Sequence, residues 1–456
     1  MSLPRYESYK DSGVEWLGEV PEHWEVQRLR FATMLNPSKN ETANLDRNTL
    51  VSFLPMEAIG VNGELNTEIA RSICDVDTGY TYFRNGDVTI AKITPCFENG
   101  KGAVMNGLVT GVGFGTTELI VVRPKESSTI SEYLYWLFTS TWFRKLGEAS
   151  MYGAGGQKRV PDEFVRNFFI GLPLVSEQEQ ICTFLTQETA KIDNLIAEQQ
   201  QLIKLLKEKR QAVISHAVTK GLNPDVPMKD SGVEWLGEVP AHWDIVPLKY
   251  LCKFSGGGTP SKENLSYWTD GNIPWVSPKD MKSFWLSDTQ DKLTAIAVNE
   301  SSTNYVESGA LLMVVRSGIL QRMIPIAINT VRVTLNQDMK ALRFNLKMNV
   351  EFAANFILGY QLPLLLEWSK EGATVESIEY EYLSNSLFPV PPIEEQETIN
   401  ESIKSRIEAF QSLEDYAVRV ISLSKERRSA LISSAVTGKI DVRNYVSTQP
   451  QVEAMA

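Results

Sequence analysis

The sequence predicts an α/β protein, built by tandem duplication, in which two mixed α/β domains are separated by two long antiparallel helices. One observation is a segment over residues 177–220 that contains neither Gly nor Pro and repeats apolar residues at heptad spacing, as a coiled-coil helix does. The other is that this segment recurs over residues 395–438, while a shorter segment over residues 10–31 recurs over residues 229–250. The offsets of the two repeats agree within one residue, which indicates a duplication of about half the chain.

The chain of 456 residues, 43% of them hydrophobic, is long enough to bury more than one core. A helix as long as the repeated segment needs a partner to cover its apolar stripe, and the repeat supplies one within the same chain. We therefore expect a first α/β domain, a first long helix, a second α/β domain, a second long helix and a tail. In order, these predicted parts span residues 1–171, 172–222, 223–389, 390–440 and 441–456.

Each half begins with a nearly identical strap, KDSGVEWLGEVP, which continues into a His-Trp pair. Its Gly, Pro and Trp residues favour a turn-rich segment whose aromatic side chains pack on a core. His23 and His242 occupy equivalent positions beside Trp24 and Trp243. We interpret the two histidines as packing or hydrogen-bonding residues rather than as catalysts.

Two regions of variable sequence, about residues 32–171 and 251–389, follow the straps. Each alternates short β-like apolar runs with turns rich in Gly, Asn and Ser and then continues into a helical stretch, which predicts a mixed α/β domain. Their frameworks align, with GDVTIAKI opposite GALLMVVR and TELIVVR opposite QDMKALR, whereas the residues carried on the frameworks differ almost everywhere. The duplication therefore kept the frame and changed the surfaces.

The two long helices are predicted to pair in antiparallel fashion, because pseudo-two-fold symmetry between the halves favours that direction. Aligning the heptads places Ile192 against Val420 and Leu202 against Phe410. Burial of apolar layers favours this register over its neighbour, which would set arginines against β-branched residues. The residues predicted to pack between the helices are Ile192, Leu195, Leu202, Val213, Ile399, Phe410, Ala417 and Val420.

Composition and motifs weigh against several classes of function. The net charge of −11 and the pI near 5.1 argue against a nucleic-acid-binding protein, which usually presents a basic face. Four dispersed cysteines without a Cys-x-x-Cys pair predict neither a disulfide framework nor a zinc site. No nucleotide-binding, nuclease or methyltransferase motif stands in a convincing context, so we expect no catalytic residue, metal or cofactor on this chain. No apolar run is long enough to cross a bilayer, and we expect a cytoplasmic protein.

A strap of the pattern SGVEWLG-x-VP-x-HW and a long helix occur in the same order in both halves. Each helix begins at Pro-x-x-x-Glu-Gln, and the two end in KRQAVISHAVTKG and RRSALISSAVTGK. In these motifs the chain closely resembles the specificity subunit of type I restriction-modification enzymes. The resemblance implies two target-recognition domains that each read one half of a split sequence in double-stranded DNA. It also implies two docked modification (methyltransferase) subunits that carry AdoMet, and restriction subunits with an ATP- and Mg-dependent translocase.

Local basic groups supply candidate DNA contacts despite the acidic net charge. Lysine and arginine bind phosphates, while arginine, lysine and glutamine also bind base edges. The candidates in the first domain are Lys92, Lys101, Gln157, Lys158 and Arg159, and those in the second domain are Thr259, Lys262, Lys279, Lys282, Arg316 and Arg322. The alternative is a coiled-coil adaptor that organises protein partners without binding DNA. The acidic pI favours this alternative, and the divergent, turn-rich surfaces do not.

Overall fold

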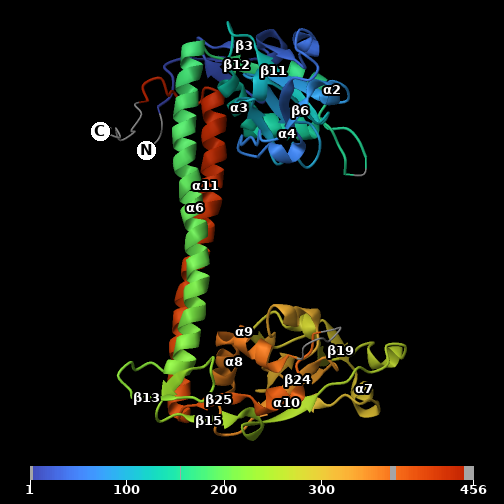
Figure 1. The fold of residues 1–456 in the computed structure, drawn as a ribbon, viewed down its shortest axis with the longest axis vertical. Helices are drawn as coiled ribbons and strands as arrows, with labels where there is room; N and C mark the ends of the chain where they lie inside the picture. Colours follow the sequence, from blue (N-terminus) through green and yellow to red (C-terminus); the bar gives the residue numbers. More distant parts are fainter. Residues whose placement is uncertain (1–3, 155, 370–375, 446–456) are drawn as a thin grey trace. The chain divides into compact units, whose positions relative to one another are not determined.

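The computed structural model describes residues 4–154, 156–369 and 376–445 of the chain (Figure 1). The chain divides into two compact units, unit 1 being Met1–Gln199 with Val418–Ala456, and unit 2 being Gln200–Ala417. Each unit holds one strap, one α/β domain and a part of each long helix. Residues 446–456 of the predicted tail lie outside the described residues.

The strap forms the same two-stranded sheet in both units. β1 (Tyr9–Asp11) pairs with β2 (Glu19–Pro21), and β13 (Met228–Asp230) pairs with β14 (Glu238–Pro240), both antiparallel. The two pairing registers are equivalent once Lys10 is aligned with Lys229. The second Trp of each strap is fully buried, as expected for an aromatic anchor on the core.

The α/β domain of unit 1 contains two four-stranded sheets. The first is antiparallel and has the order β4 (Thr33–Leu35), β11 (Leu119–Pro124), β8 (Val88–Ala91) and β9 (Gly102–Val104). The second has the order β6 (Ala70–Ser72), β5 (Leu50–Leu54), β10 (Val112–Gly115) and β7 (Thr81–Arg84), with β5 and β10 parallel. Every residue of β8 is buried, which explains why its sequence is a largely apolar run rather than an alternation.

Helices cover the first sheet and lead the chain to the long helix. α3 (Ser131–Thr139) and α4 (Thr141–Ala149) share one apolar core with β8 and β11. The sequence predicts one helical stretch over this part, but Ser140 takes an extended conformation and separates the two helices. β12 (Phe169–Leu172) then pairs with β3 (Glu25–Arg28). The short helices of this unit are α1 (Leu29–Ala32), η1 (Lys39–Thr42), η2 (Met56–Ala58), α2 (Ile73–Val76), η3 (Val109–Gly111) and α5 (Asp162–Asn167).

Unit 2 repeats this plan with one additional strand. The first sheet has the order β16 (Cys252–Gly256), β24 (Met339–Phe344), β21 (Leu311–Val314), β22 (Ile326–Asn329) and β18 (Trp285–Leu286). The second has the order β19 (Asp291–Leu293), β17 (Ile273–Val276), β23 (Val333–Leu335) and β20 (Tyr305–Val306). A separate pair joins β15 (Asp244–Pro247) to β25 (Leu387–Val390). The helices are η4 (Leu248–Tyr250), η5 (Leu265–Tyr267), η6 (Pro278–Asp280), α7 (Ala295–Glu300), η7 (Gly318–Gln321), α8 (Val350–Gly359), α9 (Gln361–Trp368) and α10 (Tyr380–Asn385).

The two domains share the strand framework that the aligned sequence runs predict. β8 pairs antiparallel with β11 in unit 1, and β21 pairs antiparallel with β24 in unit 2. These strands carry GDVTIAKI and TELIVVR in the first domain and GALLMVVR and QDMKALR in the second. The predicted tandem duplication of the frame is therefore confirmed at the level of strand pairing.

The long helices are α6 (Val175–Lys220) and α11 (Ile393–Val436), and they run antiparallel within each unit (Figure 1). In unit 1 the start of α6 shares a core with the end of α11, and farther along α6 the carboxylate of Asp193 lies 2.9 Å from Nε of Arg428. In unit 2 the end of α6 shares a core with the start of α11. The predicted antiparallel direction is confirmed.

The stripe along which the helices pack differs in part from the predicted one. Shielded residues on both helices are spaced alternately by four and three positions. On α6 they are Leu185, Thr189, Ile192, Ile196, Gln199, Ile203, Leu206, Arg210, Val213 and Ala217, and on α11 they are Ile403, Ile407, Phe410, Glu414, Ala417, Ile421, Ser424, Arg428, Leu431 and Ala435. Of the predicted packing residues, Ile192, Val213, Ile399, Phe410, Ala417 and Val420 are buried or half-buried.

Four predicted packing residues lie outside this stripe: Ile399 and Val420, which are nevertheless buried or half-buried, and Leu195 and Leu202, which are 38% and 37% exposed. The neighbours of the two leucines, Ile196 and Ile203, are more shielded in their place. The prediction is wrong for these two leucines, and the register argued from a contact between Leu202 and Phe410 loses its basis. The reason is that apolar residues flank the central stripe of α6 on both sides, and heptad spacing does not say which side faces the partner helix.

Aspartate substitutions at adjacent positions of α6 test the corrected stripe. Ile203→Asp places a charge between the helices and should lower the free energy of unfolding by about 1 to 3 kcal/mol, because a buried charge without a partner is unfavourable. Leu202→Asp is the matched control and should change it by less than about 0.5 kcal/mol, as surface substitutions usually do. Urea unfolding of the full chain, followed by the circular dichroism of the helices, measures both. A larger loss for Leu202→Asp would restore the original stripe.

Candidate nucleic-acid interface

The α/β domain of unit 1 has a polar groove where loops from its two sheets meet. Asn36 and Lys39 follow β4, Tyr80 precedes β7, Lys92 follows β8, and Thr117 lies between β10 and β11. The groove has a volume of about 270 Å³. Two cations, an amide, a hydroxyl and an aromatic ring are the side-chain types that contact phosphates and base edges.

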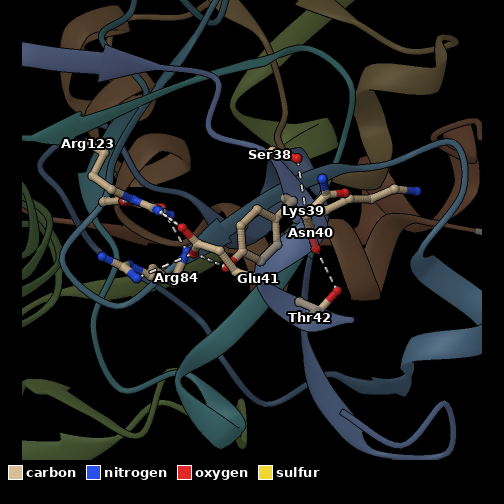
Figure 2. Close-up of polar contacts among 9 residues, drawn as sticks. Ser38, Lys39, Asn40, Glu41, Thr42, Arg84 and Arg123 are labelled. Atoms are coloured by element: carbon tan, nitrogen blue, oxygen red, sulfur yellow. Dashed lines mark hydrogen bonds and ion pairs between the residues drawn. The ribbon is translucent and has the colours of Figure 1, made fainter. Parts of the chain in front are cut away.

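A set of ion pairs fixes η1, the short helix that carries Lys39, against the sheet. Figure 2 shows Glu41 of η1 lying between Arg84 and Arg123. Arg123 Nη1 donates to Glu41 Oε1 at 2.6 Å, while Nε and Nη2 of the same guanidinium donate to the two oxygens of Asp87 at 2.6 and 2.8 Å. Tyr82 also donates its hydroxyl to Glu41, at 2.9 Å. The buried guanidinium of Arg123 therefore holds η1, which forms part of the groove wall, against the sheet.

The carboxylate of Glu41 remains charged at neutral pH. Burial alone would raise the pKa of Glu41, but hydrogen bonds from Tyr82 and Arg123 and the nearby positive charges outweigh it and lower that pKa. A carboxyl group whose pKa is lower in the folded chain than in the unfolded chain contributes stability at neutral pH and loses it as the pH falls through the folded-state pKa. Acidification through the pKa of Glu41 should therefore weaken the attachment of η1 to the sheet.

Within the groove, some polar groups serve the fold and others face outward. Asn36 adopts a positive φ of 47°, accepts the amide hydrogen of Val121 at 2.9 Å and donates to Asp162, so it shapes the loop. Lys39 donates its ammonium to the carbonyl oxygen of Asp77. Tyr80 and Thr117 are exposed. These outward groups were missed by sequence reasoning, because no local pattern distinguishes them from other loop residues.

The loop that carries the predicted residues Gln157, Lys158 and Arg159 is tied beside the groove and is only partly free. The guanidinium of Arg159 binds Glu118 in a bidentate manner, with Nη2 at 2.7 Å and Nε at 2.9 Å from its carboxylate oxygens. These hydrogen bonds lower the pKa of Glu118. Gln157 and Lys158 are exposed. The guanidinium of Arg159 is thus already hydrogen-bonded to Glu118 within the protein. Lys158 is the cation of this loop that faces solvent.

The other predicted cations of the first domain hold backbone or lie near the loop. Lys101 donates to the carbonyl oxygen of Met56 at 2.9 Å and is half-buried. Lys92 is also half-buried and is close enough to Glu118 to contribute to its lowered pKa. The structure therefore brings Lys92 and Arg159 to one acidic residue, Glu118, whereas Lys101 binds the backbone of Met56 instead.

Of the predicted residues of the second domain, some contact other side chains of the protein and others are exposed to solvent. The side chain of Thr259 bonds Gln337, and Nε of Arg316 lies 3.9 Å from the carboxylate of Asp338, so both adjoin the turn that precedes β24. That turn is the counterpart of Thr117-Glu118, which precedes β11. Lys279 pairs with Asp291 at 2.7 Å. The three remaining predicted cations, all exposed, are Lys262, Lys282 and Arg322.

The Glu-Gln pair that begins each long helix ties the strap and the α/β domain to that helix. Oε1 of Glu177 accepts from Tyr6 at 2.7 Å and from Trp24 at 3.0 Å, and Oε2 lies 2.8 Å from Nε2 of His23. In unit 2, Glu395 lies 2.7 Å from Nε2 of His242. Both histidines are therefore hydrogen-bonding residues, as predicted.

The adjacent glutamine satisfies backbone groups of the domain. The amide of Gln178 donates to the carbonyl oxygens of Ser128 and Pro173 and accepts from Thr129 and Ile130. The equivalent residue Gln396 donates to the carbonyl oxygens of Lys347 and Pro391 and accepts the amide hydrogen of Asn349. The repeated motif is thus a joint between strap, domain and helix.

Two further features bear on the class of protein. Among the residues that the structure describes, no helix combines the length and apolar character needed to span a membrane. The same described residues bring no group of three or more His, Cys, Asp or Glu side chains together in a way that could hold a metal ion.

Two spans of the chain, residues 21–205 and 240–415, match the family model of the type I restriction modification DNA specificity domain. Because these spans cover most of the chain, one in each half, the protein belongs to this family of type I restriction-modification specificity subunits.

Relatives in Escherichia coli are described as specificity subunits of type I restriction enzymes. The chain is 30% identical over 320 residues to the EcoR124I/EcoR124II specificity subunit. This match covers 68% of this chain and 71% of the relative. It is 43% identical over 189 residues to the EcoAI specificity subunit, covering 41% of this chain but 31% of the relative. The match thus spans about a third of the length of the EcoAI subunit.

Solved structures share the fold. The HsdS subunit from Thermoanaerobacter tengcongensis has a TM-score of 0.63 at 18% identity, with 92% of this chain and 98% of that chain covered. A chain from a study of complex assembly and conformational transition of the type I R-M system has a TM-score of 0.69 at 18% identity, covering 91% of this chain and 98% of that one. The predicted fold of two α/β domains and two long helices is shared with these solved chains.

Proposed function

We propose that this chain is the DNA-reading subunit of a type I restriction-modification complex and that each α/β domain reads one half of a split, asymmetric target. The observation that carries the proposal is the duplicated frame with different surfaces. In unit 1 a groove lined by Lys39 and Lys92 adjoins Glu118, which binds Arg159, whereas the equivalent turn in unit 2 adjoins Thr259 and Arg316. Two domains that share a strand framework but differ in their surface residues are suited to reading two DNA half-sites of different sequence.

The chemistry of the complex belongs, on this proposal, to partner subunits. The modification subunits supply AdoMet and the methyltransferase centre, and the restriction subunits supply ATP- and Mg-dependent activity, while this chain has no catalytic role. Exposed apolar residues on the long helices support docking of protein partners: Leu202, Leu205, Leu413 and Tyr416 in unit 2, and Leu195, Val418 and Leu423 in unit 1.

Methylation mapping of DNA from cells that express the chain with its modification subunits tests the proposal. We expect one motif with two defined halves of different sequence and an undefined gap. A continuous or palindromic motif would contradict the split reading, and no methylation together with no DNA binding by the complex would favour the adaptor alternative. As matched variants, Lys158→Ala should relax only one half of the motif and Lys262→Ala only the other.

A further inference from the structure

Unit 2 has an open groove between the end of α6 and the start of α11, with a volume of about 320 Å³. Its floor is apolar and includes Val213, Ala217 and Ile403. Its rim carries three basic side chains, those of Lys209, His216 and Arg406, all exposed. An apolar floor with a few polar groups at the edge is the usual composition of a binding pocket.

The equivalent place in unit 1 is filled by the chain itself. The alignment of the two long helices relates Ser402 and Arg406 of unit 2 to Phe184 and Glu188 of unit 1. The segment that follows α11 places the ring of Tyr445 edge-to-face on Phe184, with centroids 4.8 Å apart, and its hydroxyl 2.9 Å from Glu188. Phe184 is therefore only 2% exposed.

No such cover exists over the groove of unit 2, within the part of the chain that the structure describes. The segment that follows α6 has Pro227 at the position equivalent to Tyr445, and Leu222 at the groove is 40% exposed. Replacing Phe184 by Ser402 removes the bulk of the floor, and replacing Glu188 by Arg406 reverses the charge of the rim. The groove thus lacks the aromatic side chain that its counterpart holds and would attract one that arrives with negative charge.

The rim cations are not neutralised within the chain. Glu188 of unit 1 is paired with Lys191 at 2.6 Å. Over the described ranges of the chain, neither Lys209 nor Arg406 forms an ion pair. Glu395, which lies near Gly221 at one end of the groove, is paired with His242 at 2.7 Å. The positive charge of the rim is available to a partner, and complementary charge favours association.

We propose that this groove of unit 2 receives an acidic segment of a modification subunit, which inserts an aromatic side chain as Tyr445 does within unit 1. The proposal rests on the proposed docking of modification subunits. A phosphate group would meet the rim but leave the apolar floor uncovered, so a protein segment fits better than a nucleic acid. Because Tyr445 already occupies the counterpart, the two docking positions are unequal, and only the one at unit 2 depends on these cations.

Reconstitution of the full chain with its modification subunit tests the inference. Arg406→Glu should weaken the binding of one of two modification subunits by about tenfold or more, because reversing a charge sets like charges against each other, and leave the other bound as before. Lys404→Glu, an exposed change of the same charge on the same helix that does not line the groove, should bind two subunits like the natural chain. Native mass spectrometry measures stoichiometry, and titration calorimetry at low and high salt measures affinity.

A photo-crosslinking side chain at Ser402 gives an independent reading. The crosslinked peptide should come from the modification subunit and contain acidic residues beside an aromatic one. A crosslink to DNA, a crosslink to a basic peptide, or equal behaviour of Arg406→Glu and Lys404→Glu would overturn the inference. If the natural chain binds no modification subunit, the proposed function fails instead. If it binds two while Arg406→Glu has no effect, only the groove assignment fails.

Discussion

Arg123→Met should lower the free energy of unfolding of unit 1 by about 3 to 5 kcal/mol, because it leaves the carboxylate of Asp87 buried without its partner. Asp87 is fully buried and Arg123 is 8% exposed. The guanidinium uses Nε and Nη2 on Asp87 and Nη1 on Glu41 (Figure 2). Glu41 is partly exposed and can be hydrated after the change, whereas Asp87 cannot.

A double variant separates loss of the ion pair from loss of packing. Asp87→Asn with Arg123→Met removes both charges while the asparagine can still accept the amide hydrogen of Arg84, which Asp87 accepts at 2.8 Å. We expect it to recover more than half of the loss, since replacing a whole buried pair is far less destabilising than breaking it. Urea unfolding with hydrogen exchange at the amides of β8 and β11 measures the effect within unit 1. A change below about 1 kcal/mol for Arg123→Met would show that the pair is not needed.

Much of the fold could be predicted from the sequence because the tandem duplication makes each sequence pattern appear twice. The straps and the starts and ends of the long helices follow from patterns that repeat at nearly the same offset. The correspondence of β8 and β11 to β21 and β24 follows from the aligned apolar runs between them. The helix seam could be predicted only in part. Ile192 and Ala417 are buried as expected, but Leu202 and Ile203 are adjacent and both apolar, so a heptad period fits either.

The candidate site was less predictable because its groups are paired over long sequence distances. Arg159 has the composition of a base-reading residue, yet its partner Glu118 is 41 residues away and takes both arms of the guanidinium. Glu41, Arg84 and Arg123 likewise meet only in the folded sheet. A sequence pattern identifies cations but not the carboxylates that hold them, and the free Lys158 is recognisable only once those pairs are known.

Glu177, in the first turn of α6, should be far more important to stability than its counterpart Glu395 in the first turn of α11. Glu177 is 5% exposed and accepts from two buried donors, the hydroxyl of Tyr6 and Nε1 of Trp24, as well as contacting His23. Burial and the bond to Glu177 raise the pKa of Tyr6, so this hydroxyl remains protonated. In the described part of unit 2, Glu395 contacts His242, but Nε1 of Trp243 has no partner.

Glu177→Ala should therefore lower the free energy of unfolding by about 2 to 6 kcal/mol, from roughly 1 to 3 kcal/mol for each buried donor left unsatisfied. Glu395→Ala, the matched change, should lower it by about 1 kcal/mol or less, because it removes one partly exposed pair. Glu177→Gln should stay within about 1 kcal/mol of the natural chain, since its Oε1 can still accept from both Tyr6 and Trp24. Urea unfolding with hydrogen exchange in β1 and β2 measures all three. Equal losses for the two alanine variants would show that the joint at Glu177 contributes no more than the His-Glu hydrogen bond that both units share.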